Sequence, residues 1–273
     1  MPPMRSIAVM NQKGGVGKTT TAVNLAAALA RAGKRVCLVD LDPQAHATLH
    51  LGLDPRPDHP SIYDVLTRDA PFSHAVREVE ERLRVAGSTL DLAAAEMELA
   101  GVVGREVILR DALRAEPPAV DYLLIDCPPS LGLLTLNALA SVREVLIPLQ
   151  PHFLALHGLS KLMETLRLVA TRLNDDLRLS AVVFCMYDAN TRLAAEVAGD
   201  VEAFLDQSRG TDVPWADARI METRIRRNIR LAEAPSFGQS IFQYAPGSNG
   251  AEDYSGLAKE LAAQEAPAGV VAE

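Results

Sequence analysis

The chain has 273 residues, of which 48% are apolar and 23% are charged, and its formal net charge is −8. This composition is typical of a globular protein in water, and a chain of this length can bury a large core. The negative charge argues against attachment to DNA or to a membrane through overall charge, but it does not exclude a local basic patch.

Cysteines and apolar runs predict the compartment. Cys37, Cys127 and Cys185 lie in or beside apolar runs and form no C-x-x-C pair. We therefore expect buried, reduced thiols rather than a metal or redox site. The N-terminal stretch lacks the apolar centre of a signal peptide. No apolar run in the sequence reaches the roughly 18 residues that cross a bilayer, so we expect a cytoplasmic protein.

The order of the predicted elements indicates the fold class. Short β-branched apolar runs predict strands at 7–10, 36–40, 90–92, 122–126, 144–148 and 179–186. Helical patterns lie between and after them, near 18–32, 95–115, 133–141, 158–173, 191–207 and 250–263. This alternation predicts an α/β fold: a doubly wound, mostly parallel sheet with helices on both faces. We expect one domain over 1–273, with an ordered core at about 5–263 and a flexible tail at about 265–273.

A glycine-rich loop at 11–21 follows the first predicted strand and precedes the first helix. Glycines allow backbone N–H groups to converge on phosphate oxygens, and the helix N-terminus adds partial positive charge. In such a loop Lys18 reaches the β- and γ-phosphates of a nucleotide, and the Thr19 hydroxyl binds Mg²⁺. The pattern G-x-x-x-x-G-K-[ST] is not complete, because Gln12 replaces its first glycine and Lys13 adds a second lysine. The flanking strand and helix disfavour the alternative of a tight turn without a ligand.

Two predicted strands lead into carboxylates. Asp42 follows the strand at 36–40, and Asp126 ends the strand at 122–126. Ligands bind at the carboxyl ends of parallel strands, where the phosphate loop also lies. A carboxylate there can orient an attacking water or support Mg²⁺. Either acid taken alone is more typical of a turn or a strand end, and the phosphate loop nearby favours a functional role.

Three motifs in combination resemble the ParA/MinD superfamily of P-loop NTPases with a deviant Walker A motif. They are Lys-Gly-Gly-Val-Gly-Lys-Thr-Thr from Lys13, Asp-x-Asp-Pro-Gln from Asp40 and Ile-Asp-x-Pro-Pro from Ile125. The segment 225–236 and the Gly-Ala-Glu-Asp-Tyr sequence from Gly250 resemble the chromosomal, Soj-type ParA branch. The resemblance covers nearly the whole chain and implies an ATP- and Mg²⁺-dependent DNA-partitioning switch with weak ATPase activity. An ATP-dependent homodimer binds double-stranded DNA without sequence preference, and a ParB/Spo0J-type partner stimulates hydrolysis and release.

The resemblance also implies roles for single residues. Lys13, Lys18 and Asp42 are the expected catalytic residues: Lys13 reaches the nucleotide of the second subunit, Lys18 binds the chain's own β/γ-phosphates, and Asp42 positions the attacking water. Thr19 ligates Mg²⁺, and Asp126 holds it through water.

The remaining nucleotide-binding residues belong to the same loop. Besides Lys13, Lys18 and Thr19, they are Gly14, Gly15, Val16, Gly17 and Thr20. Gly14 is expected to keep the dimer interface close enough for the lysine in trans. Met186 and the segment 228–235 are expected near the adenine.

A cluster of positive charge interrupts this acidic chain. Five arginines fall within twelve residues, at Arg219, Arg224, Arg226, Arg227 and Arg230. Such a concentration suits phosphate contacts to duplex DNA without reading of bases. The alternative is a solvated face or a set of intramolecular ion pairs. The resemblance implies DNA contact most directly for Arg230, and the further candidates are Arg227, Arg224 and Arg192.

Two positions depart from the family pattern. Asn190 stands where related proteins often have an arginine, and Arg192 is the nearest replacement. Arg226 stands where a proline is usual, so it either adds a phosphate contact or only alters the loop.

Three other classes share this scaffold. A MinD-like membrane switch needs a C-terminal amphipathic helix with basic residues, and this sequence has none after Lys259. An iron–sulfur carrier needs paired cysteine ligands, which the sequence lacks. The serious rival is an ATP-dependent synthetase or kinase for a small molecule, which needs neither Lys13 in trans nor an arginine cluster. We expect a cytoplasmic, nucleoid-associated protein with no membrane role.

Overall fold

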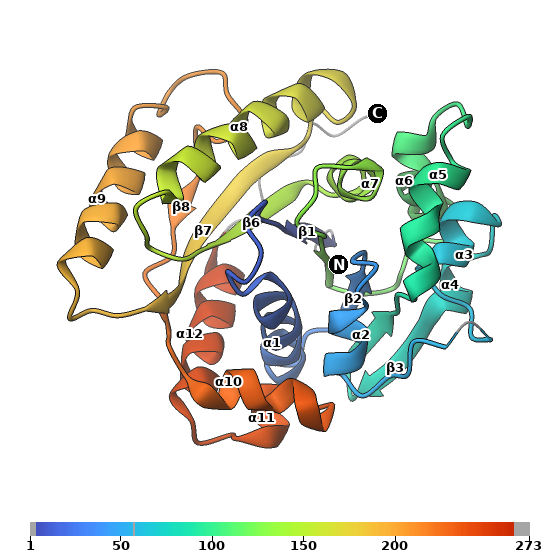
Figure 1. Ribbon diagram of the computed structural model, residues 1–273, viewed down its shortest axis with the longest axis horizontal. Helices are drawn as coiled ribbons and strands as arrows, with labels where there is room; N and C mark the ends of the chain where they lie inside the picture. Colours follow the sequence, from blue (N-terminus) through green and yellow to red (C-terminus); the bar gives the residue numbers. More distant parts are fainter. Residues whose placement is uncertain (1–3, 57, 265–273) are drawn as a thin grey trace.

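The computed structural model describes residues 4–56 and 58–264 and has a sheet at its centre (Figure 1). The strand order is β3-β4-β2-β5-β1-β6-β7-β8, and β9 pairs with β7. β3 and β4 are antiparallel, whereas the other described pairs are parallel. The strands are β1 (Arg5–Val9), β2 (Val36–Asp40), β3 (Val76–Glu80), β4 (Leu83–Ala86), β5 (Tyr122–Asp126), β6 (Glu144–Leu149), β7 (Arg178–Tyr187), β8 (Arg219–Ile220) and β9 (Ile225–Arg226).

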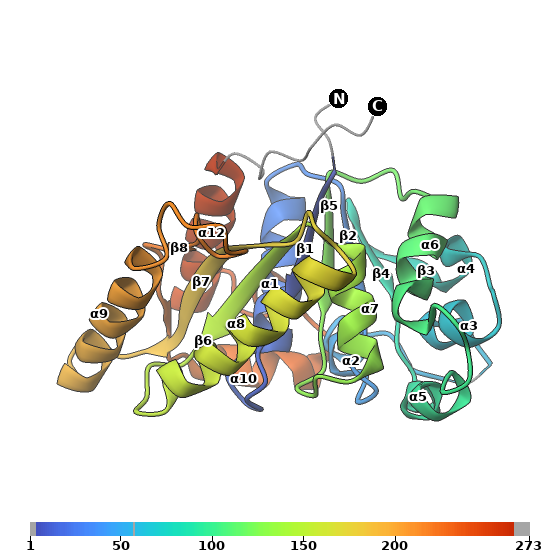
Figure 2. The same cartoon turned by 90° about the horizontal axis from the view of Figure 1, so that it is seen from above.

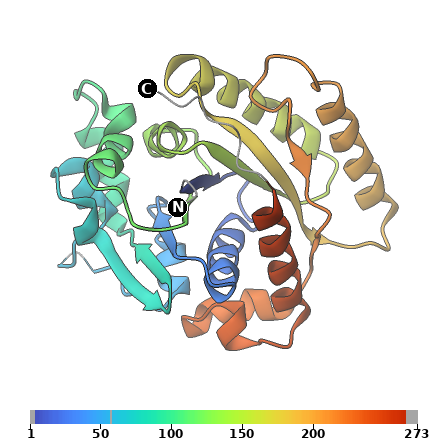
Figure 3. The same cartoon turned by 180° about the vertical axis from the view of Figure 1, so that it is seen from behind.

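Helices cover both faces of this sheet, as the sequence predicted. The longer ones are α1 (Lys18–Arg31), α6 (Ile108–Ala115), α7 (Leu133–Ser141), α8 (Ala155–Arg172), α9 (Arg192–Asp206) and α12 (Asn249–Ala263). The short ones are α2 (His46–His50), α3 (Ile62–Thr67), α4 (Phe72–Ala75), α5 (Ala95–Glu98), α10 (Ile229–Glu233) and α11 (Ile241–Tyr244). Figures 1 and 3 show α1 and α12 side by side on one face, with α7 and α8 on the other.

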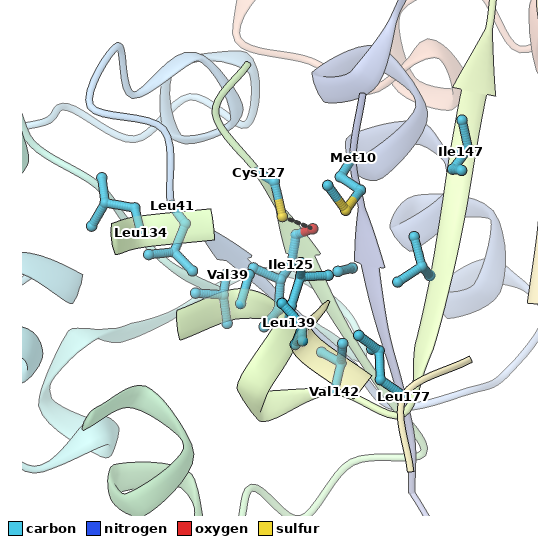
Figure 4. Close-up of a cluster of buried hydrophobic side chains, with 14 of the residues drawn as sticks. Met10, Val39, Leu41, Ile125, Cys127, Leu134, Leu139, Val142, Ile147 and Leu177 are labelled. Atoms are coloured by element: carbon cyan, nitrogen blue, oxygen red, sulfur yellow. Dashed lines mark hydrogen bonds between the residues drawn. The ribbon is translucent and has the colours of Figure 1, made fainter. Parts of the chain in front are cut away.

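Alternating side chains along the central strands build a core on each face. Ile7 and Val9 belong to the core that α1 and α12 cover, whereas Ala8 and Met10 belong to the core beneath α7 and α8. Successive side chains of a strand point to opposite faces, so a strand buried on both sides is apolar throughout. Figure 4 shows Met10 in the second core, together with apolar side chains from β2, β5, β6 and α7.

The sheet edge beyond β2 shows that the predicted strand at 90–92 is wrong. Residues 90–92 form no strand but begin the 3₁₀ helix η1 (Leu90–Ala94), and the edge is the hairpin of β3 and β4. The hairpin sequence, Val-Arg-Glu-Val-Glu-Glu-Arg-Leu-Arg-Val-Ala from Val76, contains no apolar run. An edge strand keeps one side in water and tolerates charges, so β3 forms without an apolar run.

The predicted helix at 95–115 is also wrong in part. It is divided into α5 and α6, with the 3₁₀ turn η2 (Arg105–Val107) between them. Gly101 and Gly104 fall in the interruption, and glycine is unfavourable inside a helix. The other predicted helices are confirmed within a few residues. The single domain over 1–273 stays a prediction, and the predicted tail at 265–273 lies outside the described residues.

A buried ion pair joins β1 to β6. Arg5 and Glu144 are 8% and 1% exposed, and the guanidinium donates to the carboxylate from Nε at 2.8 Å and from Nη2 at 2.6 Å. Its Nη1 donates to the Leu261 carbonyl in the last turn of α12 at 2.6 Å. Arg5 therefore ties two strands and one helix together at the amino ends of the parallel strands.

We expect Glu144→Ala to lower the free energy of unfolding by about 3–5 kcal/mol, because it leaves the guanidinium buried without its partner. Chemical denaturation followed by circular dichroism measures this loss. Glu81→Ala is the matched control, since Glu81 is 90% exposed and its Oε1 lies 3.5 Å from Nε of Arg82. An exposed pair of this kind contributes little. Equal losses in the two variants would contradict the importance of the buried pair.

Candidate functional site

The phosphate loop connects β1 to α1 at the carboxyl edge of the sheet (Figure 2). Asn11 anchors its first turn, because Nδ2 donates to the Pro148 carbonyl at 2.8 Å and Oδ1 accepts the Lys13 N–H at 3.0 Å. Gly17 precedes α1 with a φ of +93°, a conformation that strains other residues. Among the described residues no side chain caps α1, so its first backbone N–H groups are available to an anion.

Lys18 opens α1 and lies beneath the loop. It is 7% exposed, and its Nζ donates across the loop to the Lys13 carbonyl at 3.1 Å. Burial lowers the pKa of Lys18, and the nearby carboxylates of Asp126 and Asp42 oppose this change. A lysine held in this position can neutralise phosphate charge at the helix N-terminus.

Asp126 is fully buried at the end of β5, and neither carboxylate oxygen has a hydrogen-bond partner in the described part of the chain. Burial raises the pKa of Asp126 well above its usual range, and repulsion from Asp40 adds to the rise, while the Thr19 side chain opposes it. An unpartnered buried carboxylate calls for a cation or for ordered water. Asp126 therefore fits a Mg²⁺ ion held through water above it.

The donor set also fits magnesium. Among the described residues, no three His, Cys, Asp or Glu side chains form a group that could hold a metal ion. Mg²⁺ keeps several waters and takes few protein ligands together with substrate phosphates. A threonine hydroxyl with one carboxylate behind it, as at Thr19 and Asp126, matches that requirement.

The two acids after β2 have different environments. Asp40 is fully buried and accepts hydrogen bonds from the Thr48 N–H at 2.8 Å, the Thr48 hydroxyl at 2.7 Å and the Asp42 N–H at 3.1 Å. Burial raises the pKa of Asp40 to about 6. Asp42 faces the site, with Oδ1 accepting the Gln44 N–H at 2.9 Å. Asp40 therefore shapes the turn that presents the Asp42 carboxylate.

A cavity of about 780 Å³ lies over the loop. Most of the predicted nucleotide-binding residues line it, namely Gly14, Gly15, Gly17, Lys18, Thr19 and Thr20, together with Asp42. Val16 is a buried residue of the loop and does not line the cavity. Lys13 does not line it either, so the structure brings every predicted loop residue to the site except these two.

The far side of the cavity comes from β7 and from the segment after β9. Met186 lines it with a φ of +52°, and so do residues 227–229 and 231–232. A non-glycine residue with positive φ is uncommon and is often found at a binding site. Met186 and, of the predicted segment 228–235, residues 228, 229, 231 and 232 therefore share one cavity with the phosphate loop, whereas residues 230 and 233–235 do not line it. Contact with adenine stays a prediction.

Several lining residues received no site role from the sequence, and His46, Cys185 and Tyr254 are among them. The Tyr254 hydroxyl lies 3.2 Å from the Thr21 hydroxyl and joins α12 to α1 beneath the site. Its position in the Gly-Ala-Glu-Asp-Tyr motif was the available signal. His46 and Cys185 are single residues in ordinary contexts, and no local pattern marked them.

Lys13 points away from the cavity. Its side chain is exposed, and its Nζ lies 2.7 Å from Nε2 of His152, in the loop between β6 and α8. The His152 Nδ1 accepts the Leu154 N–H at 3.1 Å. Burial lowers the pKa of His152, and the charge of Lys13 lowers it further. The second lysine of the loop is thus free of the chain's own phosphate site.

The predicted DNA-contacting arginines differ in their surroundings. Arg227 and Arg192 are exposed and form no ion pair within the described ranges. Arg230 is 55% exposed, and its Nη1 lies 2.9 Å from Oε2 of Glu233. The three are accessible to a phosphate, and DNA contact stays a prediction for each.

Two further arginines are held by neighbouring groups. The Arg224 guanidinium lies over the Phe184 ring, 5.0 Å from its centroid, and donates to the Met221 carbonyl. Arg226 binds Asp253 from Nη2 at 2.6 Å and Glu252 at 2.7 Å. Of the two alternatives for Arg226, the structure therefore favours a link from β9 to α12 over a free phosphate contact.

The fold and the site define a P-loop nucleotide-binding protein. The family model described as an AAA domain matches residues 4–179. The chain is 47% identical over 258 residues to the sporulation initiation inhibitor protein Soj of Bacillus subtilis, covering 94% of this chain and 98% of that protein. It is also 47% identical over 261 residues to the chromosome-partitioning ATPase Soj of Thermus thermophilus, covering 96% of each. The chain belongs to the ParA/Soj family of chromosome-partitioning ATPases.

Solved structures show the same architecture. A structure described as cobyrinic acid a,c-diamide synthase from Mycobacterium smegmatis with bound ADP and magnesium is 35% identical, with a TM-score of 0.79 and coverage of 95% of this chain and 94% of that one. The septum site-determining protein MinD of Pyrococcus horikoshii with Mg-ADP is 25% identical, with a TM-score of 0.74 and coverage of 95% and 96%. Within the described residues, no helix has the length and apolarity to cross a membrane.

The raised pKa of Asp126 predicts a pH dependence. A buried acid that prefers its protonated form stabilises the folded chain below its unfolded pKa of about 3.9, and this contribution is lost as the pH rises through the higher folded pKa. We expect the nucleotide-free protein to melt at a lower temperature at about pH 8 than at about pH 5, and Asp126→Asn to show a smaller decrease. Mg²⁺ with ATP should raise the melting temperature of the parent chain far more than that of Asp126→Asn.

Thermal melts followed by circular dichroism test both effects. Asp111→Asn is the control, because Asp111 is 60% exposed and distant in the fold from the phosphate loop; it should behave as the parent chain. An unchanged pH profile in Asp126→Asn would contradict the role of this buried carboxyl.

Proposed function

We propose that this chain is an ATP-dependent DNA-partitioning switch that binds DNA as an ATP-bound homodimer and releases it after slow ATP hydrolysis. The observation that carries the proposal is the position of Lys13. Its exposed side chain adjoins the phosphate loop but does not line the chain's own cavity. A lysine in that position can neutralise phosphate charge on a nucleotide bound to a second subunit.

The cavity supplies the parts that phosphoryl transfer to water requires. The loop amides and Lys18 hold the β- and γ-phosphates, and Asp42 orients the attacking water. Thr19 and, through water, Asp126 would hold Mg²⁺, which neutralises charge on the phosphates when bound. Such transfer depends mainly on positioning and on charge neutralisation. Met186 and the segment that follows β9 enclose the adenine.

Exposed apolar side chains support a second subunit beside Lys13. Phe153 and Leu154 follow His152 and are 87% and 60% exposed. Exposed apolar groups next to a charged site are typical of an interface. In the dimer Lys13 leaves His152 for the phosphates bound to the second subunit, so nucleotide is required on both sides of the interface.

The arginines supply the DNA contacts. Arg230 is the principal candidate, and the exposed Arg227 and Arg192 add to it. Arg224 contributes only if its guanidinium leaves the Phe184 ring and the Met221 carbonyl. Guanidinium groups bind phosphate oxygens without reading bases, which suits binding to any duplex sequence. A ParB/Spo0J-type partner that stimulates hydrolysis then ends DNA binding, and the protein is a nucleoid-associated component of the cytoplasm with no membrane role.

Dimerisation is tested in a variant that binds ATP without hydrolysing it. We expect Asp42→Ala with Mg²⁺ and ATP to elute as a dimer in size-exclusion chromatography, because hydrolysis is blocked. The double variant Lys13→Ala/Asp42→Ala should elute as a monomer while still binding ATP. Lys13→Ala alone should lower ATP turnover by about a hundredfold, the usual effect of removing one preorganised charge contact. A stable dimer in the double variant would contradict the role of Lys13 in trans.

DNA binding is tested with Arg230→Ala in the presence of ATP. We expect its affinity for unrelated duplex sequences to fall uniformly, by about tenfold, and the slope of log affinity against log salt to decrease by about one. Fluorescence anisotropy at several salt concentrations measures both. Arg77→Ala is the control, since Arg77 is an exposed arginine of β3, outside the arginine cluster at 219–230. Unchanged DNA affinity in Arg230→Ala would transfer the role to other residues.

A small-molecule synthetase is the second candidate, because a solved structure described as a synthase is 35% identical to this chain. Such an enzyme couples ATP cleavage to a particular acceptor and completes its site without Lys13. ATP turnover that rises with duplex DNA and a ParB-type N-terminal peptide, without a small-molecule acceptor, supports partitioning. Turnover that requires an acceptor supports the synthetase.

A further inference from the structure

The DNA-contacting arginine predicted with most support is already engaged by an acid of the same helix. Arg230 and Glu233 are three residues apart on α10, with Nη1 and Oε2 at 2.9 Å. Asn228 caps this helix and accepts the Arg230 N–H on Oδ1 at 2.9 Å. The backbone of Arg230 is therefore fixed, and its guanidinium can exchange one anion for another without refolding of the helix.

Glu233 is held in place by a second group. The Tyr244 hydroxyl donates to the same Oε2 at 2.9 Å, and the Tyr244 ring stacks on Phe237 at a centroid distance of 4.9 Å. Hydrogen bonds from Tyr244 and Arg230 lower the pKa of Glu233, so this carboxylate is an anion at neutral pH. A hydrogen bond to an ionised acceptor is stronger than one between neutral groups and fixes the carboxylate orientation.

We propose that Glu233, oriented by Tyr244, is a built-in competitor for DNA phosphate at Arg230 and sets the affinity of the chain for DNA. The inference rests on the proposed DNA-binding function. A phosphate that binds Arg230 must displace the Glu233 carboxylate. Breaking this ion pair therefore reduces the favourable free energy of the phosphate contact at Arg230. An exposed pair is weak, and a polyanion can therefore replace it while a single free phosphate competes poorly.

The neighbouring arginine has no such competitor. Arg227 forms no ion pair in the described part of the chain, and it lines the nucleotide cavity. Arg226 is bound by Asp253 and Glu252 on α12, which anchors the loop. Arg230 differs from Arg226 and Arg227, because its exposed guanidinium and the Tyr244 hydroxyl of α11 bind the same Glu233 carboxylate. A change at Glu233 or Tyr244 therefore alters how readily Arg230 binds a phosphate.

Affinity for a fluorescein-labelled duplex of arbitrary sequence, measured with Mg²⁺ and ATP, tests the proposal. We expect Glu233→Gln to bind DNA about threefold or more tightly than the parent chain, because its amide pairs weakly with Arg230. Glu222→Gln is the matched control. It makes the same charge change near the arginines, but the Glu222 carboxylate has no ion pair within the described residues, so its gain should be clearly smaller.

Two further variants separate a local ion pair from a general charge effect. Tyr244→Phe changes no charge, and it should also tighten DNA binding, though less than Glu233→Gln. In an Arg230→Ala background, Glu233→Gln should give no gain beyond that of Glu222→Gln. Size-exclusion chromatography with ATP and thermal melts check that the variants dimerise and fold as the parent chain does.

The outcomes are distinct. Equal gains in Glu233→Gln and Glu222→Gln, or a gain that persists without Arg230, would overturn the proposal even where Arg230→Ala still weakens binding. Weaker DNA binding by Tyr244→Phe would overturn the orienting role of Tyr244. Unchanged affinity in Arg230→Ala alone would instead overturn the DNA-binding role of Arg230, on which this inference rests.

Discussion

A buried carboxylate without a partner is the constraint on which the nucleotide site depends. Asp126 ends the central strand β5, with Asp40 and Asp42 close enough to raise its pKa and with Lys18 opposing them. Lys18 is the ammonium group close to both Asp126 and Asp42, and burial removes the water that would otherwise stabilise charge on these carboxyl groups. A hydrated divalent cation supplies both the positive charge and the water that the buried Asp126 carboxylate lacks. Binding of Mg²⁺ with a nucleotide therefore favours the ionised form of Asp126.

The two lysines of the phosphate loop differ in burial and in their nearby negative charge. Lys18 can be buried because the Lys13 carbonyl accepts a hydrogen bond from its Nζ and the Asp126 and Asp42 carboxylates stabilise its positive charge. Within the described residues Lys13 forms no ion pair, and its side chain remains at the surface against His152. The backbone of one lysine thus binds the side chain of the other. A change in the loop that moves Lys13 toward another molecule also affects the hydrogen bond that holds Lys18.

Local sequence was sufficient for the parts of the site that depend on backbone conformation. The glycines before Lys18, the apolar runs before Asp42 and Asp126 and the helical pattern of α1 each act over a few residues, and the structure places them as predicted. The hairpin of β3 and β4 was missed because an edge strand does not need an apolar run. The pairing of Arg226 with Asp253 spans 27 residues of chain, and no local pattern encodes such a contact.

The same limit applies to the roles of the acids. Asp40 and Asp42 are two residues apart and look equivalent in sequence, yet Thr48 on α2 satisfies one of them and leaves the other facing the cavity. Which acid is structural depends on where α2 packs. α2 packs in turn against α1 and against the 3₁₀ turn that continues the arginine segment.

The contact between these two segments is a close approach of glycines. A Cβ atom on Gly238 would lie 2.8 Å from the Gly52 Cα, so neither backbone can move toward the other. Gly52 follows α2, and Gly238 follows the 3₁₀ helix η3 (Ala234–Phe237), which continues directly from α10. His50 is buried at this contact, and burial lowers its pKa to about 4, so it is neutral at physiological pH.

This arrangement places Asp42 and the arginine segment on two sides of the packed contact between α2 and η3. Asp40 holds α2 through Thr48, α2 packs against η3, and α10 presents Arg230 and Glu233 to solvent. Packed backbones with no space between them are displaced together rather than independently. Asp42 and residues 228, 229, 231 and 232 line one cavity on the two sides of this contact. We therefore expect a substitution at Gly52 or Gly238 to alter the cavity and the arginine segment together.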